Sequence, residues 1–125
     1  MKKYLFIALA FLSFTLFAKN APLISQHDFM AMQMSAKPAV VLDVRSAKEY
    51  ADGHIKGAIN ISHDELSERL NELSQYKDKT VVVYCRSGRR AGIAESLMEK
   101  NGFNKVKHLT GDMNGWLKAE LPVIK

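Results

Sequence analysis

Cys85 is the single cysteine of this 125-residue chain, and its neighbours are those of a reactive thiol. It follows the apolar run Thr-Val-Val-Val-Tyr at 80–84 and begins the segment Cys-Arg-Ser-Gly-Arg-Arg at 85–90. A helix is expected over 91–100, so the N–H groups of the turn should converge at a helix N-terminus. That positive end and the three arginines both favour a thiolate. The pattern predicts a nucleophile in an anion-binding cradle.

The elements that must position this thiol alternate between strands and helices. Strands are expected at 39–44, 58–61, 80–84 and 105–109, and helices at 25–34, 46–52, 62–73, 91–101 and 111–120. Alternation with short connections predicts an α/β fold, a parallel twisted sheet of about five strands with helices on both faces. Ligands of such sheets bind beyond the carboxyl ends of the strands, and Cys85 lies at one of those ends.

Serine-led motifs predict where three helices begin. In each motif a serine is followed three residues later by an acidic residue; the pairs are Ser25 with Asp28, Ser46 with Glu49 and Ser62 with Glu65. The last motif should open a longer helix with leucines at 66, 70 and 73 on one face. The helix after the thiol should end at Gly102 and turn four apolar residues inward: Ile93, Ala94, Leu97 and Met98.

The N-terminus has the pattern of an export signal. Residues 1–3 are basic at two positions, 4–17 are apolar apart from two hydroxyl residues, and Ala18 offers a small residue for cleavage. A helix over this stretch would be about 22 Å long, short of a hydrocarbon core of about 30 Å. We therefore expect a signal peptide at 1–18, a single domain at 19–125, a periplasmic location and no stable membrane insertion after cleavage. The alternative is a membrane-spanning anchor.

Charge and cysteine content narrow the range of functions. The formal net charge is +5, and removal of Lys2 and Lys3 would lower it to +3. The lysines are scattered without interleaved aromatic residues, so no nucleic-acid partner is expected. An exported chain with one cysteine cannot form an internal disulfide, and the thiol is therefore either reactive or paired between molecules. The alternative is an inert buried cysteine, which the polar, glycine-bearing flanks disfavour.

Three motifs in this order resemble the signatures of rhodanese-like domains. The first is Leu-Asp-Val-Arg at 42–45 with Glu49-Tyr50 and the stretch Gly-His-Ile-Lys-Gly-Ala-Ile-Asn-Ile at 53–61; the second is the segment 85–90; the third is Gly-Asp-Met-Asn-Gly-Trp at 111–116 with Leu-Pro-Val at 121–123. The resemblance covers residues 22–124. Within the family, the chain is most similar to small, exported, single-domain thiosulfate sulfurtransferases.

The resemblance implies sulfur transfer through a persulfide on Cys85, from a small anionic donor such as thiosulfate to cyanide or a thiol. It implies no cofactor and no metal. The implied substrate-binding residues are those of the loop: Arg86, Ser87, Gly88, Arg89 and Arg90. Ser87 and Gly88 permit a tight turn. Arg86 and Arg90 would bind oxyanion oxygens through planar guanidinium groups, whereas Arg89 is either a binder or a solvent-facing residue at the helix start.

Loop length separates this chemistry from that of related phosphatases and arsenate reductases. Those enzymes place an arginine six positions after the cysteine, whereas Ala91 occupies that position here and Arg90 lies five after. The shorter loop predicts a smaller cradle, suited to one sulfur atom on Cys85. Two further alternatives are a non-catalytic binding module and a carrier that delivers polysulfide sulfur to a membrane-bound respiratory partner.

Several polar or aromatic residues outside the loop are expected to be structural. Asp43 and Arg45 fit either a salt-bridged scaffold or the pocket, with the scaffold favoured. His54 should bond to backbone within a turn, and Trp116 should cover the core, with an edge that could line the pocket. The remaining histidines have no metal-ligand spacing: they are His27, His63 and His108.

Overall fold

The computed structural model describes residues 21–125, and the expected signal peptide at 1–18 lies outside them. A five-stranded sheet crosses the molecule in the order β1-β5-β4-β2-β3, with every neighbouring pair parallel. The strands are β1 (Leu23–Ile24), β2 (Val40–Asp43), β3 (Ile59–Asn60), β4 (Val81–Tyr84) and β5 (Val106–Leu109). The fold class predicted from the sequence is confirmed. β1 was missed because two residues carry no periodic pattern.

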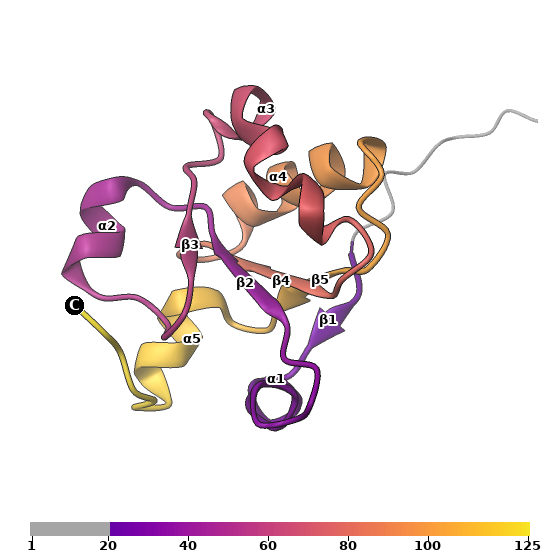
Figure 1. Ribbon diagram of the computed structural model, residues 1–125. Helices are drawn as coiled ribbons and strands as arrows, with labels where there is room; N and C mark the ends of the chain where they lie inside the picture. The colour runs from indigo at the N-terminus through magenta and orange to yellow at the C-terminus, as the bar shows by residue number, and fades with distance from the viewer. Residues whose placement is uncertain (1–20) are drawn as a thin grey trace, which may run out of the picture.

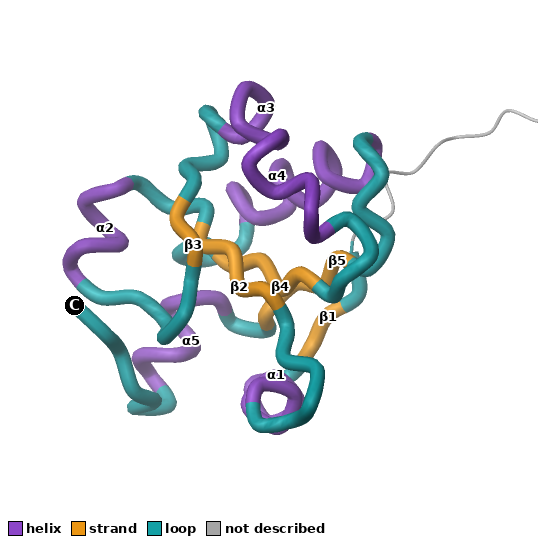
Figure 2. The backbone as a smooth tube through the Cα atoms, viewed as in Figure 1, coloured by secondary structure: helices purple, strands orange, loops and turns teal. Residues whose placement is uncertain are grey.

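Helices cover both faces of the sheet (Figures 1 and 2). They are α1 (Gln26–Gln33), α2 (Ala47–Asp52), α3 (Leu66–Arg69), the 3₁₀ helix η1 (Leu70–Tyr76), α4 (Arg89–Lys100) and α5 (Asp112–Lys118). α3 and α4 lie on one face, and α1 and α5 lie on the other (Figure 1). No helix within residues 21–125 is both long and apolar enough to cross a membrane.

Two of the three serine motifs begin helices as predicted. Ser25 caps α1 by accepting the N–H of Asp28 at 3.0 Å. Ser46 and Glu49 form both hydrogen bonds of a capping box at the start of α2. The third prediction was wrong, because the Ser62 hydroxyl donates to the Asp64 carboxylate instead of capping a helix. The expected long helix is accordingly the four-residue α3 followed by η1.

The helix after Cys85 is positioned as expected, and most of the residues predicted to face inward do so: Ala94 and Met98 are buried, and Leu97 packs against the core. α4 ends before Gly102, which has a φ of +93°, as a C-terminal glycine does. Ile93, predicted to face inward, is 46% exposed. Glu95 is buried instead, because it meets His108 of β5 at 2.7 Å. Apolar spacing alone cannot identify a buried carboxylate whose partner lies on another element.

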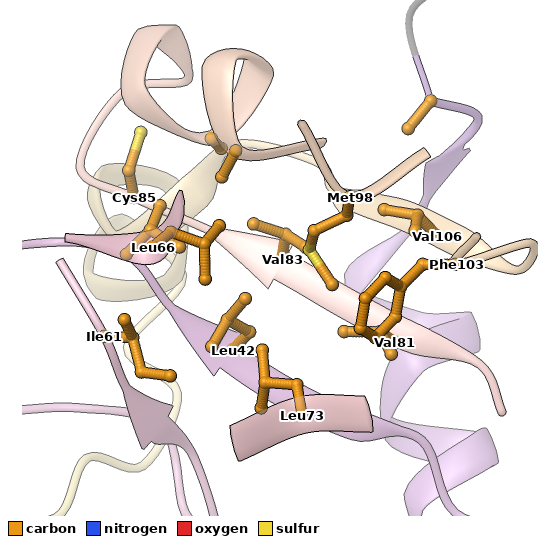
Figure 3. Packing of buried hydrophobic residues seen from close by; sticks show 14 residues of the cluster. Leu42, Ile61, Leu66, Leu73, Val81, Val83, Cys85, Met98, Phe103 and Val106 are labelled. Carbon is orange, nitrogen blue, oxygen red and sulfur yellow. The ribbon is translucent and has the colours of Figure 1, made fainter. Parts of the chain in front are cut away.

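A hydrophobic cluster fills each side of the sheet. The cluster under α3 and α4 includes Leu42, Leu66, Val83, Met98 and Phe103. The other includes Phe29, Val82, Tyr84, Leu109 and Trp116. Consecutive β4 residues alternate between the two clusters, as the two-residue period of a strand requires. Cys85 lies at the edge of the first cluster, and its sulfur points away from Leu42 and Ile61 (Figure 3).

Candidate active site

Cys85 lies at the carboxyl end of β4, the central strand, with its side chain enclosed by the loop that follows. The residue is 1% exposed, and the Gly88 N–H donates to its Sγ at 3.0 Å. Gly88 is the N-cap of α4 and has a φ of +121°, a conformation that L side chains rarely adopt. The tight turn predicted for this loop is therefore present, and glycine is what permits it.

The first turn of α4 directs free N–H groups toward the loop. No side chain caps this helix, and within residues 21–125 the N–H groups of Arg89, Arg90 and Ala91 have no protein acceptor. These are the N-terminal donors that an α-helix cannot satisfy internally. Together with the Gly88 N–H they provide donors and a positive helix end for a bound anion or an anionic sulfur.

The N-terminus of α5 fastens the loop from behind. The Met113 N–H donates to the Cys85 carbonyl at 2.9 Å, and the Asn114 N–H donates to the Arg86 carbonyl at 3.1 Å. The Cys85 N–H donates to Asp112 Oδ1 at 3.0 Å. Sequence reasoning missed Asp112, although an acidic residue directly after a glycine at a predicted helix start was the available signal.

Arg90 is paired with an acidic residue that sequence reasoning had assigned only to a helix cap. Its two terminal nitrogens donate to Glu49 Oε1 at 2.7 Å and to Oε2 at 3.0 Å. Glu49 also accepts from the N–H and hydroxyl of Ser46. The hydrogen bond from Arg90 is the main reason that the pKa of Glu49 falls from 4.5 to about 2. Arg90 thus ties the start of α4 to the start of α2.

The other loop side chains face solvent. Arg86, Ser87 and Arg89 are exposed, and neither Arg86 nor Arg89 forms an ion pair within residues 21–125. The structure therefore divides the loop arginines into one that is paired and two that remain unpaired near the thiol. The first-turn donors and these two cations can act on an anionic donor.

A buried cluster of charged side chains lies behind the loop. His108 of β5 contacts Glu95 of α4 through Nδ1 at 2.7 Å and Asp112 of α5 through Nε2 at 3.0 Å. The hydrogen bonds to Asp112 and then to Glu95 raise the pKa of His108 to about 10. Burial raises the pKa of Glu95. His108, for which the sequence predicted only the lack of metal-ligand spacing, is held between two carboxylates.

Asp43 and Arg45 form part of a buried scaffold. The Arg45 guanidinium donates to Asp43 Oδ2 at 2.7 Å and to the Gly53 carbonyl at 2.8 Å. The Tyr84 hydroxyl donates to the same Asp43 oxygen at 2.7 Å and accepts the Ile55 N–H at 3.1 Å. Burial raises the pKa of Tyr84. These contacts match the scaffold role favoured from the sequence.

His54 and Trp116 are structural as well. His54 Nδ1 lies 2.9 Å from the Tyr50 carbonyl, and its ring stacks on the Tyr50 ring at 3.6 Å. The backbone contact agrees with the expectation for this histidine. Trp116 packs edge-on against Phe29 within the core and donates to the Pro122 carbonyl at 2.8 Å. In the part of the chain that is described, no group of His, Cys, Asp or Glu residues is arranged to hold a metal ion.

In this geometry a thiol at the end of a central parallel strand lies at the N-terminus of the next helix. A comparison with known families agrees with it. The family model for the Rhodanese-like domain matches residues 25–119. The chain belongs to the rhodanese-like domain family. This rhodanese-like chain carries its cysteine on the second of the three motifs that resemble the family's signatures.

Known relatives agree with the family assignment. The chain is 35% identical over 99 residues to the putative sulfur carrier protein YrkF of Bacillus subtilis, covering 79% of this chain and 52% of YrkF. A rhodanese-related protein of Thermoplasma volcanium is 30% identical, with a TM-score of 0.72 over 82% of this chain and 97% of that one. The human single-domain sulfurtransferase TSTD1 is 27% identical, with a TM-score of 0.69 over 78% of this chain and 96% of that one. The chain thus spans about half the length of YrkF.

Proposed function

We propose that this rhodanese-like chain is a thiosulfate sulfurtransferase that carries sulfur on Cys85, similar to phage shock protein E. The observation that carries the proposal is the environment of the thiol. The Gly88 N–H donates to Sγ at 3.0 Å, and the next N–H groups of α4 have no protein acceptor within residues 21–125. Membership in the family and the likeness to a human sulfurtransferase support the reaction class.

In the first half-reaction the Cys85 thiolate attacks the outer sulfur of thiosulfate. A bond forms between Sγ and that sulfur while the sulfur–sulfur bond of thiosulfate breaks, and sulfite leaves with the electron pair. Cys85 is then a persulfide anion. The free N–H groups at the start of α4 stabilise this anion, and the exposed Arg86 and Arg89 attract the dianionic donor.

In the second half-reaction a nucleophilic acceptor takes the outer sulfur of the persulfide. Cyanide forms a carbon–sulfur bond to it and leaves as thiocyanate, and the electron pair of the broken sulfur–sulfur bond returns to Cys85 as a thiolate. A thiol acceptor acts in the same way. No general base is needed once the nucleophile is a thiolate.

The test follows sulfur on the protein and in solution. Incubation with thiosulfate should add the mass of one sulfur atom to the wild-type chain, and cyanide should remove it with release of thiocyanate. Parallel double-reciprocal lines are expected when donor and acceptor are varied, because the half-reactions share one covalent intermediate. The Cys85→Ser variant should show neither the mass increase nor turnover. Full activity in that variant would refute the proposal.

A second candidate is a carrier that takes sulfur from polysulfide and passes it to a respiratory partner. The relative YrkF is named a putative sulfur carrier protein, and this name supports the second candidate. Both candidates use the same persulfide, so the donor separates them. Under identical acceptor conditions, a kcat/KM for polysulfide far above that for thiosulfate would favour the carrier and displace thiosulfate as the donor.

We further propose that the enzyme acts in the periplasm after loss of residues 1–18. The support is the basic start and short apolar run of the sequence. N-terminal sequencing of protein recovered from the periplasm should find a chain beginning near position 19. A chain that begins at Met1 and sediments with membranes would replace this proposal with a tethered enzyme.

A further inference from the structure

Two buried carboxylates and a part-buried histidine, from three elements, meet directly behind the Cys85 loop. Glu95 of α4 and Asp112 of α5 are each 3% exposed, and His108 of β5 lies between them. Neither the proposed attack on thiosulfate nor the return of the sulfur uses these groups. A buried chain of charges that ends on the backbone of the nucleophile therefore needs a separate explanation.

We propose that His108 is a positioning residue for Cys85: as an imidazolium bridging Glu95 and Asp112, it holds the Asp112 carboxylate on the Cys85 N–H. The kinetic consequence rests on the proposed sulfurtransferase function, whereas the structural consequence does not.

The Asp112 carboxylate touches the loop at both of its ends. Oδ1 accepts the Cys85 N–H at 3.0 Å, and Oδ2 lies so near Gly88 that a Cβ on that glycine would be 3.3 Å from it. Gly88 in turn supplies the N–H that meets Sγ. A rotation of this carboxylate would therefore move the start of the loop and the turn that faces the sulfur. The side chain needs a second anchor, and His108 provides it at Oδ2.

The anchor depends on charge. The charged groups that face His108 are Glu95 from α4 and Asp112 from α5, and its register neighbours in the sheet, Leu23 on β1 and Val83 on β4, are apolar. A neutral imidazole would leave two buried carboxylates near each other beneath an anionic sulfur. The raised pKa of His108, about 10, keeps the bridging charge in place at neutral pH.

Asp112 also has an unusual backbone conformation. Its φ is +53°, one of two positive values among the described residues that are not glycine. Asp and Asn tolerate this region better than other residues. Asn at this position keeps an oxygen for the Cys85 N–H but loses the charge, whereas Ala loses both and adds backbone strain. Asp112→Asn therefore tests the charge of the anchor while an acceptor for the Cys85 N–H is retained.

The first experiment needs no activity. The backbone ¹⁵N of position 85, detected through the carbonyl carbon of Tyr84, is followed from pH 7 to pH 11 together with the His108 ring carbons. Recording it in Cys85→Ser removes the titration of the thiol. The ¹⁵N signal should shift in step with His108 near pH 10. The step should disappear in His108→Gln and persist in His27→Gln, which removes a surface histidine–aspartate pair. A position-85 signal that stays constant while His108 titrates would overturn the proposal.

The second experiment measures kcat/KM for thiosulfate at pH 7.5. Misplacement of the nucleophile should lower it roughly tenfold to hundredfold in Asp112→Ala, which loses the acceptor, and also in Asp112→Asn, which loses the charge that His108 anchors. An Asp112→Asn variant as active as wild type would contradict anchoring by charge. If His108→Gln does not fold, the titration of Cys85→Ser still decides. If the wild-type chain lacks sulfur transfer but shows the coupled titration, the proposed function fails and the positioning role stands.

Discussion

Arg90 of α4 and Glu49 of α2 form a two-point ion pair, with nitrogen–oxygen distances of 2.7 and 3.0 Å. The pair joins the first turns of two helices that begin beyond neighbouring strands. Both terminal nitrogens of Arg90 are used in this contact, so the loop presents Arg86 and Arg89 as its cations without an ion pair in the described part of the chain. Arg90 thus supports the loop, and we expect Arg86 and Arg89 to recognise the anion.

Glu49→Gln should reduce stability in a pH-dependent way. The pKa of Glu49 is lowered in the folded state from 4.5 to about 2, mainly by Arg90, so its contribution is present above pH 4.5 and is lost as the pH falls toward 2. Urea unfolding at pH 7 should show the variant about 1–2 kcal/mol less stable, the order expected for a partly exposed charge-assisted pair. The difference should shrink between pH 4.5 and pH 2, and a constant difference would contradict the pairing.

Arg86→Ala should raise the KM for thiosulfate by roughly tenfold to hundredfold, because one charge-assisted contact contributes about 1–3 kcal/mol. The KM for a neutral polysulfane donor should change far less, since it lacks the anionic oxygens. Steady-state kinetics with both donors checks this, with Lys118→Gln, at an exposed position near the end of α5, as the charge-matched control. An equal rise for both donors would mean that Arg86 shapes the loop instead of binding the anion.

Tyr84→Phe should destabilise the fold but spare the thiol chemistry. The hydroxyl satisfies Asp43 and the Ile55 N–H, both buried, so its loss should cost about 1–3 kcal/mol in urea unfolding. Tyr50→Phe is the matched control, because that hydroxyl makes a single part-buried bond to Ala58 and should cost less. The rate of persulfide formation per folded molecule should match that of wild type. A large loss of that rate would mean that the buried scaffold contributes to the reaction.

Wild-type protein should hydrolyse aryl phosphates at a negligible rate beside its thiosulfate turnover. The loop from Cys85 to Arg90 is one residue shorter than the phosphatase spacing, and Arg90 is held by Glu49. The cradle therefore lacks an arginine placed to wrap a tetrahedral oxyanion. Parallel assays of both substrates, with Cys85→Ser as the blank, check this. Comparable rates for the two substrates, with an inactive blank, would show that loop length does not select the chemistry.

Local signals in the sequence determined much of this structure. Valine-rich runs located β2 and β4, and the strand before Cys85 placed the thiol at a carboxyl end of the sheet. Ser25 and Ser46 identified helix starts because capping acts over three residues. Gly88 and Gly102 identified a tight turn and a helix end because only their backbones adopt those conformations readily. Each of these inferences depends on interactions within a few residues.

Only the tertiary structure decided which charged groups meet. Arg90 pairs with Glu49, 41 residues away, and the Cys85 N–H bonds to Asp112, 27 residues away. His108 is enclosed by carboxylates from two helices, although nothing near it in the sequence distinguishes it from the exposed His27. Electrostatic and hydrogen-bond partners depend on position in space and on burial. The residue patterns of the chain indicate only the periodicity of helices and strands and the positions of turns. The sequence therefore located the candidate nucleophile, and the fold selected the residues that hold it.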